Sequence, residues 1–307
     1  MDNTPNYVIE MLHITKEFPG VKALDNVSFQ VRRGEIKALV GENGAGKSTL
    51  MNVLSGVYPE GTYTGDLVVD GEICHFKSIQ QSEHAGIAII HQELALIPML
   101  SIAENIFIGN PQMKHGAIDW IQTRIKAAAL MERVGLTDDP DTPINQIGVG
   151  KQQLVEIAKA LSKNCKVLIL DEPTAGLDPG ERVRFRNLLS EFAQERIVLI
   201  STHIVSDVEY IAAENAVMKA GKIIAQDTTE GLVKQIEAKV WQGNIPMEQL
   251  SRWEYRLRVV NLRNEPDGTV TLRYLADAPQ LPDSVPAQPR LEDLYLWLFP
   301  EEMEEAK

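Results

Sequence analysis

The 307-residue sequence has few cysteines, no long apolar run and little positive charge. Its two cysteines, Cys74 and Cys165, are too few for a disulfide framework, which favours a reducing compartment. No stretch approaches the roughly 18 apolar residues that a bilayer-spanning helix needs. Residues 1–9 include Asp2 and no basic cluster, so we expect no signal peptide and expect any membrane role to come through a partner subunit.

Acidic residues outnumber basic ones, 43 against 30, which gives a net charge of −13. Binding to nucleic acid needs a basic face that neutralises phosphates, so the composition argues against a nucleic-acid partner. Apolar residues make up 44% of the chain and charged residues 24%, as in an average globular protein. At about 150 residues per domain, the length suggests two domains.

Short apolar stretches alternate with helical patterns through the first part of the chain. This alternation predicts an α/β domain over residues 1–225, with a mainly parallel core sheet. The expected strands lie at 27–31, 36–40, 86–90, 167–170 and 197–201, and the expected helices at 48–57, 120–135, 152–162 and 181–194.

The pattern changes from about Gln226. Two strands, a proline-rich loop and a short amphipathic helix are expected there, at 255–260, 269–274, 279–289 and 290–299. Residues 226–307 are therefore predicted to form a small C-terminal α+β appendage. Three of its tryptophans are expected in the core of the appendage: Trp241, Trp253 and Trp297.

Residues 41–49 (GENGAGKST) match the phosphate-loop pattern G-x-x-x-x-G-K-[ST], between a predicted strand and a predicted helix. Glycines let backbone N–H groups converge on phosphate oxygens, and the helix directs its positive end at them. Lys47 would contact the β and γ phosphates, and the Ser48 hydroxyl would ligate Mg²⁺. The predicted nucleoside triphosphate site comprises Gly41, Glu42, Asn43, Gly44, Ala45, Gly46, Lys47, Ser48 and Thr49.

A second buried strand, 167–170, ends in Asp171 and Glu172. We expect this strand to lie beside the phosphate-loop strand, so that Asp171 is delivered to Mg²⁺. Glu172, one residue further out, could polarise an attacking water. Any buried strand that ends in acids imitates this pattern, which therefore gains its weight from the phosphate loop.

Four further motifs follow along the chain. They are 90–93 (IHQE) with Gln92, 147–153 (IGVGKQQ), 175–178 (AGLD) with Asp178, and 201–203 (STH) with His203. Together with the phosphate loop, they resemble the Q-loop, signature motif, D-loop and switch histidine of ATP-binding-cassette (ABC) transporter ATPases. P-loop kinases and GTPases lack this set, so the resemblance over residues 8–203 is specific.

The resemblance implies a P-loop NTPase cassette with an antiparallel β subdomain and a helical subdomain at about 93–165. It implies ATP and Mg²⁺ as cofactors. It further implies that two cassettes face each other, with ATP between one phosphate loop and the signature helix of the other, which begins near Lys151. Phe18 stands where the family places an aromatic on the adenine.

The resemblance assigns roles to individual residues. Glu172, His203 and Gln92 would be catalytic, and the metal ligands would be Ser48, Gln92 and Asp171. Besides residues 41–49, the nucleotide contacts would be Phe18, Gly148, Gly150 and Asp178.

The signature departs from the common Leu-Ser-Gly-Gly-Gln. This chain has Gly148 for serine, Val149 for the first glycine and Lys151 for glutamine. Losing the serine hydroxyl removes one hydrogen bond to phosphate, worth about 1–3 kcal/mol if charge-assisted. We interpret the sequence as a sugar-importer variant rather than an inactive site.

Residues 8–174 resemble the first cassette of bacterial xylose and multiple-sugar importers, whose ATPases normally carry two cassettes in one chain. Residues 175–307 instead resemble single-cassette ATPases of exporter type. The chain therefore looks like a mosaic with a seam near 168–175, and the alternative is ordinary divergence within one subfamily.

We expect the ATP-hydrolysing subunit of a membrane transporter, on the cytoplasmic face of the cell membrane. Sugar import is the first expectation and export the alternative; a hydrolysis-silent or non-transport cassette is less favoured. The implied partners are permease subunits, a second nucleotide-binding domain and a sugar-binding protein.

Overall fold

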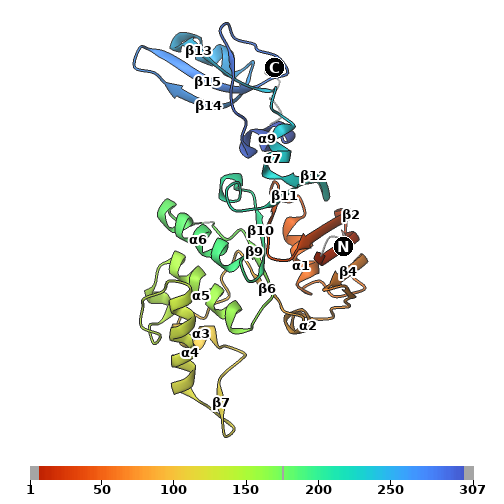
Figure 1. Ribbon diagram of the computed structural model, residues 1–307, viewed down its shortest axis with the longest axis vertical. Coiled ribbons are helices and arrows are strands. Elements are labelled where there is room, and N and C mark those ends of the chain that lie inside the picture. The colour runs from red at the N-terminus through yellow and green to blue at the C-terminus, as the bar shows by residue number, and fades with distance from the viewer. Residues whose placement is uncertain (1–6, 175, 301–307) are drawn as a thin grey trace, which may run out of the picture. The chain divides into compact units, whose positions relative to one another are not determined.

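The computed structural model describes residues 7–174 and 176–300 (Figure 1). The chain divides into two compact units between Ile224 and Ala225. Within the described ranges, no helix combines the length and the apolar character that crossing a membrane requires.

A six-stranded sheet lies at the centre of the first unit, in the order β12-β11-β3-β10-β9-β6. The pairs from β11 to β6 are parallel, which confirms the predicted mainly parallel sheet. Every residue of β3, β9 and β10 is buried, as is typical of strands covered on both faces. The strands are β3 Ile36–Val40, β6 Ile87–Ile90, β9 Val167–Asp171, β10 Ile197–Thr202, β11 Glu214–Lys219 and β12 Lys222–Thr228.

One expectation about this sheet is wrong. The acidic strand β9 does not lie beside the phosphate-loop strand β3, because β10 lies between them. Val198 of β10 is in register with Ile36 on one side and with Leu168 on the other. All three strands are buried on both faces, so their pattern of burial carries no information about which strand pairs with which.

The helix α1 (Lys47–Leu54) follows β3 and packs into the main apolar core. Its buried side chains include Leu50, Met51 and Leu54, which join Leu39 of β3 and Ile169 of β9. This packing fixes the end of α1 that follows the phosphate loop. The short helix α2 (Ile79–His84) precedes β6.

A separate antiparallel sheet has the order β2-β1-β4-β5. Its two long strands bury alternate side chains against the main core, for example Ile9, Met11, Phe29 and Val31. The strands are β1 Tyr7–Phe18, β2 Val21–Arg32, β4 Thr64–Val69 and β5 Glu72–Ile73.

The segment between β6 and β9 contains the helices α3, α4 and α5 (Figure 1). The helix α4 begins after Asp119, whose carboxylate accepts the Gln122 N–H, and α3 begins with a capping box between Ser101 and Glu104. The elements are α3 Ile102–Ile106, β7 Met113–Lys114, β8 Ala117–Ile118, α4 Trp120–Arg133, a 3₁₀ turn Ile144–Gln146 and α5 Val149–Ser162.

The helix α6 spans Pro179–Phe192, two residues earlier than expected at its start. Asp178 caps it by accepting the Glu181 N–H, and Pro179 occupies the first turn, where proline is favoured. A 3₁₀ turn, Val205–Asp207, follows β10.

The second unit is built on an antiparallel sheet in the order β14-β15-β13-β16. Its apolar core centres on Tyr274 and Leu272, and Trp241 and Trp253 pack partly buried against it. The strand expected at 255–260 begins only at Arg258, since a helix precedes it. The elements are α7 Thr229–Lys234, β13 Val240–Pro246, a 3₁₀ turn Met247–Gln249, α8 Leu250–Glu254, β14 Arg258–Asn264, β15 Thr269–Leu275, β16 Val285–Pro286 and α9 Leu291–Leu298.

Candidate nucleotide site

The phosphate loop connects β3 to α1, and its glycines are required by the backbone. Gly44 and Gly46 have φ values of 80° and 106°, in the left-handed region that disfavours other residues. A Cβ on Gly46 would also come within 2.5 Å of the Ala23 carbonyl oxygen. The loop therefore holds its backbone N–H groups in a tight turn at the start of a helix, which is a ready anion site.

Lys47 is buried at the first position of α1, with 5% of its surface exposed. Its Nζ donates to the carbonyl oxygens of Gly41 at 2.8 Å and Glu42 at 3.1 Å. The same ammonium lies 3.5 Å from the Glu172 carboxylate. The cation is thus held at the loop by its own backbone and by the acid of the second strand.

Glu172 follows β9 and has a φ of 50°, an uncommon value for a residue with a side chain. Its N–H donates to the Ser201 carbonyl oxygen at 2.8 Å, which anchors the turn to β10. Its Oε2 lies 2.7 Å from His203 Nδ1 and also accepts from the Thr202 hydroxyl and the His203 N–H, each at 3.3 Å. The two residues predicted from separate motifs therefore meet directly.

A cleft of about 410 Å³ opens at the phosphate loop. Predicted residues that line it include Lys47, Ser48, Gln92 and Glu172. Asp171 is buried nearby at the end of β9, and its Oδ1 has no hydrogen-bond partner among the described residues. A buried carboxylate oxygen without a partner is expensive unless something binds it, so Asp171 is suited to a cation.

Five residues that line the cleft carry no recognisable motif and were not predicted: Val21, Lys22, Ala23, Ala220 and Gly221. Phe18 is not among the lining residues. Its ring packs edge-on against Tyr58, with centroids 5.5 Å apart, and the Lys16 ammonium lies 4.9 Å from the centre of each ring. Tyr58 gave no signal in the sequence beyond being aromatic.

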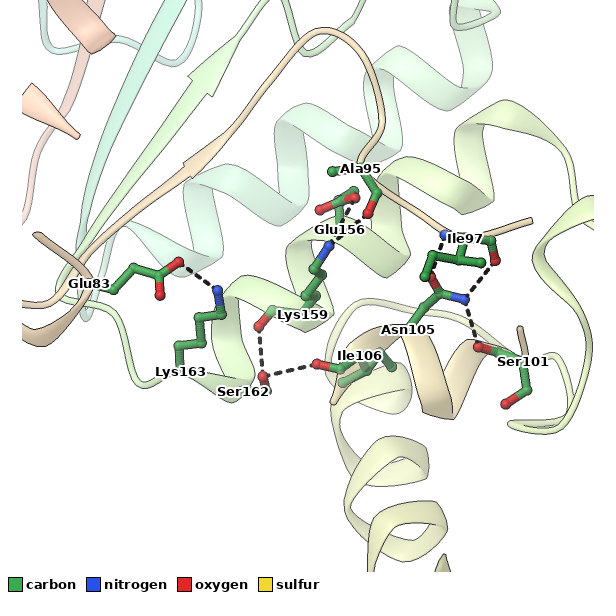
Figure 2. A network of polar contacts seen from close by, with 10 residues as sticks. All are labelled: Glu83, Ala95, Ile97, Ser101, Asn105, Ile106, Glu156, Lys159, Ser162 and Lys163. Atoms are coloured by element: carbon green, nitrogen blue, oxygen red, sulfur yellow. Dashed lines mark hydrogen bonds and ion pairs between the residues drawn. The ribbon is translucent and has the colours of Figure 1, made fainter. Parts of the chain in front are cut away.

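The segment that follows Gln92 is tied to two helices (Figure 2). Lys159 of α5 donates to the Ala95 carbonyl oxygen at 3.0 Å and lies 3.5 Å from Glu156. Asn105 of α3 is fully buried; it accepts from the Ile97 N–H at 2.7 Å and donates to the Ile97 carbonyl oxygen at 3.1 Å. The backbone beyond Gln92 is thereby attached to the helical part of the unit.

The signature residues Gly148 and Gly150 and the D-loop residue Asp178 do not line this cleft. Gly148 precedes α5, Gly150 lies in its first turn, and Asp178 caps α6. Ala175, in the same D-loop, lies outside the described residues. The structure thus brings together the phosphate loop, Gln92, Glu172 and His203, and leaves the signature elsewhere on the same unit.

The carboxylate of Glu181 lies directly against Gly150. A Cβ on Gly150 would come closer to the Glu181 carboxyl group than real Cβ contacts do, whereas a Cβ on Gly148 would meet nothing within 4 Å. Lys151 points its ammonium at Asp138, 2.8 Å away. A side chain at position 150 would therefore have to displace the flexible end of Glu181, whereas one at 148 would displace nothing.

A strand, a glycine loop, a helix and a buried acidic strand on one parallel sheet define a P-loop nucleoside triphosphatase fold. A family model described as ABC transporter matches residues 24–175. An ATP-binding cassette solved in its ADP conformation, MJ1267, is 28% identical, with a TM-score of 0.67, over 75% of this chain and 94% of that one. CbiO1 from Clostridium perfringens is 25% identical, with a TM-score of 0.64, over 81% of this chain and 99% of that one. The chain belongs to the ABC transporter family.

Curated relatives are similar over most of this chain. The L-arabinose transport ATP-binding protein AraG of Geobacillus stearothermophilus is 57% identical over 219 residues, 71% of this chain and 43% of the relative. The xylose import ATP-binding protein XylG of Thermoanaerobacter pseudethanolicus is 49% identical over 229 residues, 74% of this chain and 45% of the relative. This chain therefore spans about half the length of the curated relatives it matches.

The length of these matches bears on the predicted seam. A match of 219 residues is longer than the part of the chain before residue 175 and also longer than the part after it. The match therefore crosses the seam wherever it begins. Similarity to sugar-importer cassettes therefore continues into the second half of the first unit. The mosaic origin stays a prediction.

Proposed function

We propose that this chain is the ATP-binding and ATP-hydrolysing subunit of an ABC transporter that imports a sugar. The observation that carries the proposal is the cleft at residues 41–49, where the buried Lys47 ammonium lies 3.5 Å from the buried Glu172 carboxylate. A phosphate cradle next to a carboxylate that can act on water is the minimum for hydrolysis of a phosphoanhydride.

The residues present fit a magnesium ion. Asp171 offers a buried carboxylate oxygen without a partner, and Ser48 and Gln92 line the cleft with further oxygens. Oxygen ligands of this kind suit Mg²⁺, which when bound neutralises charge on the β and γ phosphates. We infer that ATP and Mg²⁺ are the cofactors.

Glu172 is the proposed base that orients the attacking water. Its contacts with His203 and Thr202 fix its carboxylate at the end of β10, which limits the positions the water can take. Lys47 would exchange its carbonyl partners for phosphate oxygens and so stabilise the negative charge of the nucleotide. Phe18, with Tyr58 beside it, is the proposed adenine contact.

A second cassette is the proposed source of the remaining contacts. Gly148, Gly150 and Asp178 lie outside the cleft, so within one chain they are separate from the proposed catalytic residues. An α5 N-terminus from a partner copy would supply backbone N–H groups to the γ-phosphate. We propose a pair of cassettes, formed by two copies or by a paired cassette in another chain.

The names of the relatives support sugar import as the transport direction. The proposed partners are permease subunits and a sugar-binding protein, which would place the chain peripherally on the cytoplasmic face of the cell membrane. Export is the second candidate, and it is supported by the second compact unit, which resembles the appendage of exporter-type ATPases in sequence.

Purified protein with Mg²⁺ tests the first part of the proposal. ATP hydrolysis per molecule should rise with protein concentration, because two cassettes must meet, and should stop on removal of Mg²⁺. Absence of hydrolysis at every concentration would refute the activity. Reconstitution with candidate permeases, with ATP on the cassette side, then separates import from export by the direction in which labelled sugar accumulates.

A further inference from the structure

A band of exposed apolar side chains covers the hairpin β7–β8 and the start of α4. The band comprises Met113, Ile118, Trp120, Ile121 and Ile125, and we call it the hairpin–α4 band. Each of these side chains exposes between 41% and 71% of its surface. Single exposed apolar residues are ordinary, but five between positions 113 and 125 need an explanation.

The geometry places these side chains on shared faces. Met113 and Ile118 are directly opposite each other in the hairpin, so they project from the same side of it. Ile121 and Ile125 are four residues apart and share one face of α4. The opposite face of α4 is the one packed into the protein, through Thr123, Ala127 and Met131.

The charge beside the band is positive in a chain of net charge −13. Lys114, Arg124 and Lys126 are all exposed, and Asp119 is the one acid between positions 113 and 126. The Asp119 carboxylate caps α4, and Asp141, outside this segment, pairs with Arg124. Within the segment that carries the band, basic residues therefore outnumber acidic ones by three to one.

Two of these cations lack acidic partners. Arg124 pairs with Asp141, whereas Lys126 contacts only the Gln112 amide. Within residues 7–174 and 176–300, neither Lys114 nor Lys126 forms an ion pair. Exposed cations without carboxylates are available for an anionic surface outside the protein.

The position of the band separates it from the nucleotide cleft. Figure 1 shows β7 and α4 at the end of the helical part, with α5 between them and the core sheet. None of the five band residues lines the cleft at the phosphate loop. A contact at the band would leave nucleotide binding accessible.

We propose that the hairpin–α4 band binds the surface of an anionic lipid bilayer. Isoleucines and a tryptophan flanked by lysines are the composition of segments that lie in the headgroup region, with the apolar groups inserted and the cations among anionic headgroups. Such a surface accepts aliphatic groups without a matched pocket. Its negative charge complements Lys114 and Lys126, which the chain itself leaves without carboxylates.

Flotation of the full-length protein without nucleotide tests this proposal independently of ATP hydrolysis. Wild type should float with vesicles of equal parts phosphatidylcholine and phosphatidylglycerol, and remain at the bottom with phosphatidylcholine alone. Ile121→Asn/Ile125→Asn should lower the bound fraction by more than about tenfold. Lys114→Gln and Lys126→Gln should each lower it about fivefold, and added salt should do the same.

Two matched variants provide the controls. Val183→Asn on α6 removes an apolar side chain that is 47% exposed, and Lys77→Gln removes an exposed cation; both should float as wild type does. Nucleotide binding should be unchanged in every variant, which excludes misfolding. The proposal is overturned if wild type does not float or if the isoleucine variant floats equally well. Loss of copurification with a permease in detergent, without flotation, would assign the band to a protein partner instead.

Discussion

The two helix N-termini expected to meet phosphate differ in what their own chain supplies. At the start of α1, the buried Glu172 carboxylate lies within ion-pair distance of the buried Lys47 and within hydrogen-bonding distance of His203. At the start of α5, the nearest described acid, Glu181, lies against Gly150, and Lys151 is paired with Asp138. The first terminus is equipped for chemistry within one chain, whereas the second offers little beyond its backbone, as expected if it serves a partner.

Lys47→Ala should break the first terminus most severely. Removing the ammonium takes away charge-assisted hydrogen bonds to phosphate, so ATP affinity should fall by more than about 100-fold. Lys151→Ala, the lysine at the other terminus, is the matched control and should leave the affinity of isolated chains unchanged. Fluorescent ATP titration of both variants measures the difference. Equal losses would mean that the two termini are not distinct in the way described.

Glu172→Gln should separate binding from chemistry. The amide keeps the shape of the side chain but cannot act as a base, so hydrolysis should fall by roughly 10² or more while ATP still binds. An ATP-bound dimer should then accumulate, visible by size-exclusion chromatography with light scattering. Hydrolysis at the wild-type rate would remove Glu172 from the proposed role.

Gly150→Ala should disturb the second terminus without touching the first. Its new methyl group would displace the flexible Glu181 carboxylate, which accepts from the Asp178 N–H, and loss of that hydrogen bond would destabilise by about 0.5–1.5 kcal/mol. Gly148→Ala, where nothing lies within 4 Å, is the control and should melt as wild type does. Adding Glu181→Ala to Gly150→Ala should cause no further loss, because the same capping contact is already broken. An additive loss in the double variant would assign the Gly150→Ala defect to another contact.

Lys159→Met should have the smallest effect, because it removes only one contact between α5 and the segment that follows Gln92. The variant loses the hydrogen bond to the Ala95 carbonyl oxygen, so kcat should fall about fivefold while ATP affinity stays constant. Lys163→Met, at the residue that directly follows α5 and is paired with Glu83, is the matched control (Figure 2). The free energy of unfolding of both variants should stay within about 1 kcal/mol of the wild-type value. A fall in kcat for both variants would indicate a general weakening of α5.

Much of the first unit could be predicted because its motifs and periodicity agree. The strand expected at 36–40 has the same bounds in the structure, since a short, mostly apolar run that ends at a glycine is typical of a buried strand. The order of the strands could not be predicted: β3, β9 and β10 are equally buried, and pairing depends on packing of the helices between them. The contact between Glu172 and His203 depends on β9 and β10 being neighbours, so it could not be predicted from the sequence either.

The second unit was harder to predict because its strands are short and partly exposed. β13 was missed altogether, and β14 begins at Arg258 rather than at Tyr255 because α8 occupies the residues before it. The short strand β16 lies inside the stretch expected to be a proline-rich loop. β13 lies between β15 and β16, but Gly243 occupies one of its buried positions, so the apolar alternation is interrupted in the sequence. The edge strands β14 and β16 are mostly exposed, so pattern alone could not separate them from loops.

The central place of β10 has a consequence for synthesis of the chain. The phosphate-loop strand β3 leaves the ribosome early, yet its two neighbours in the sheet, β10 and β11, come from residues 197–219. Until those residues emerge, β3 has no backbone partner on either side, and its apolar faces are exposed. Such long-range pairing is slow and leaves nascent chains prone to aggregation. The strand that carries the phosphate loop therefore stays without either of its sheet neighbours while residues 41–196 are being made.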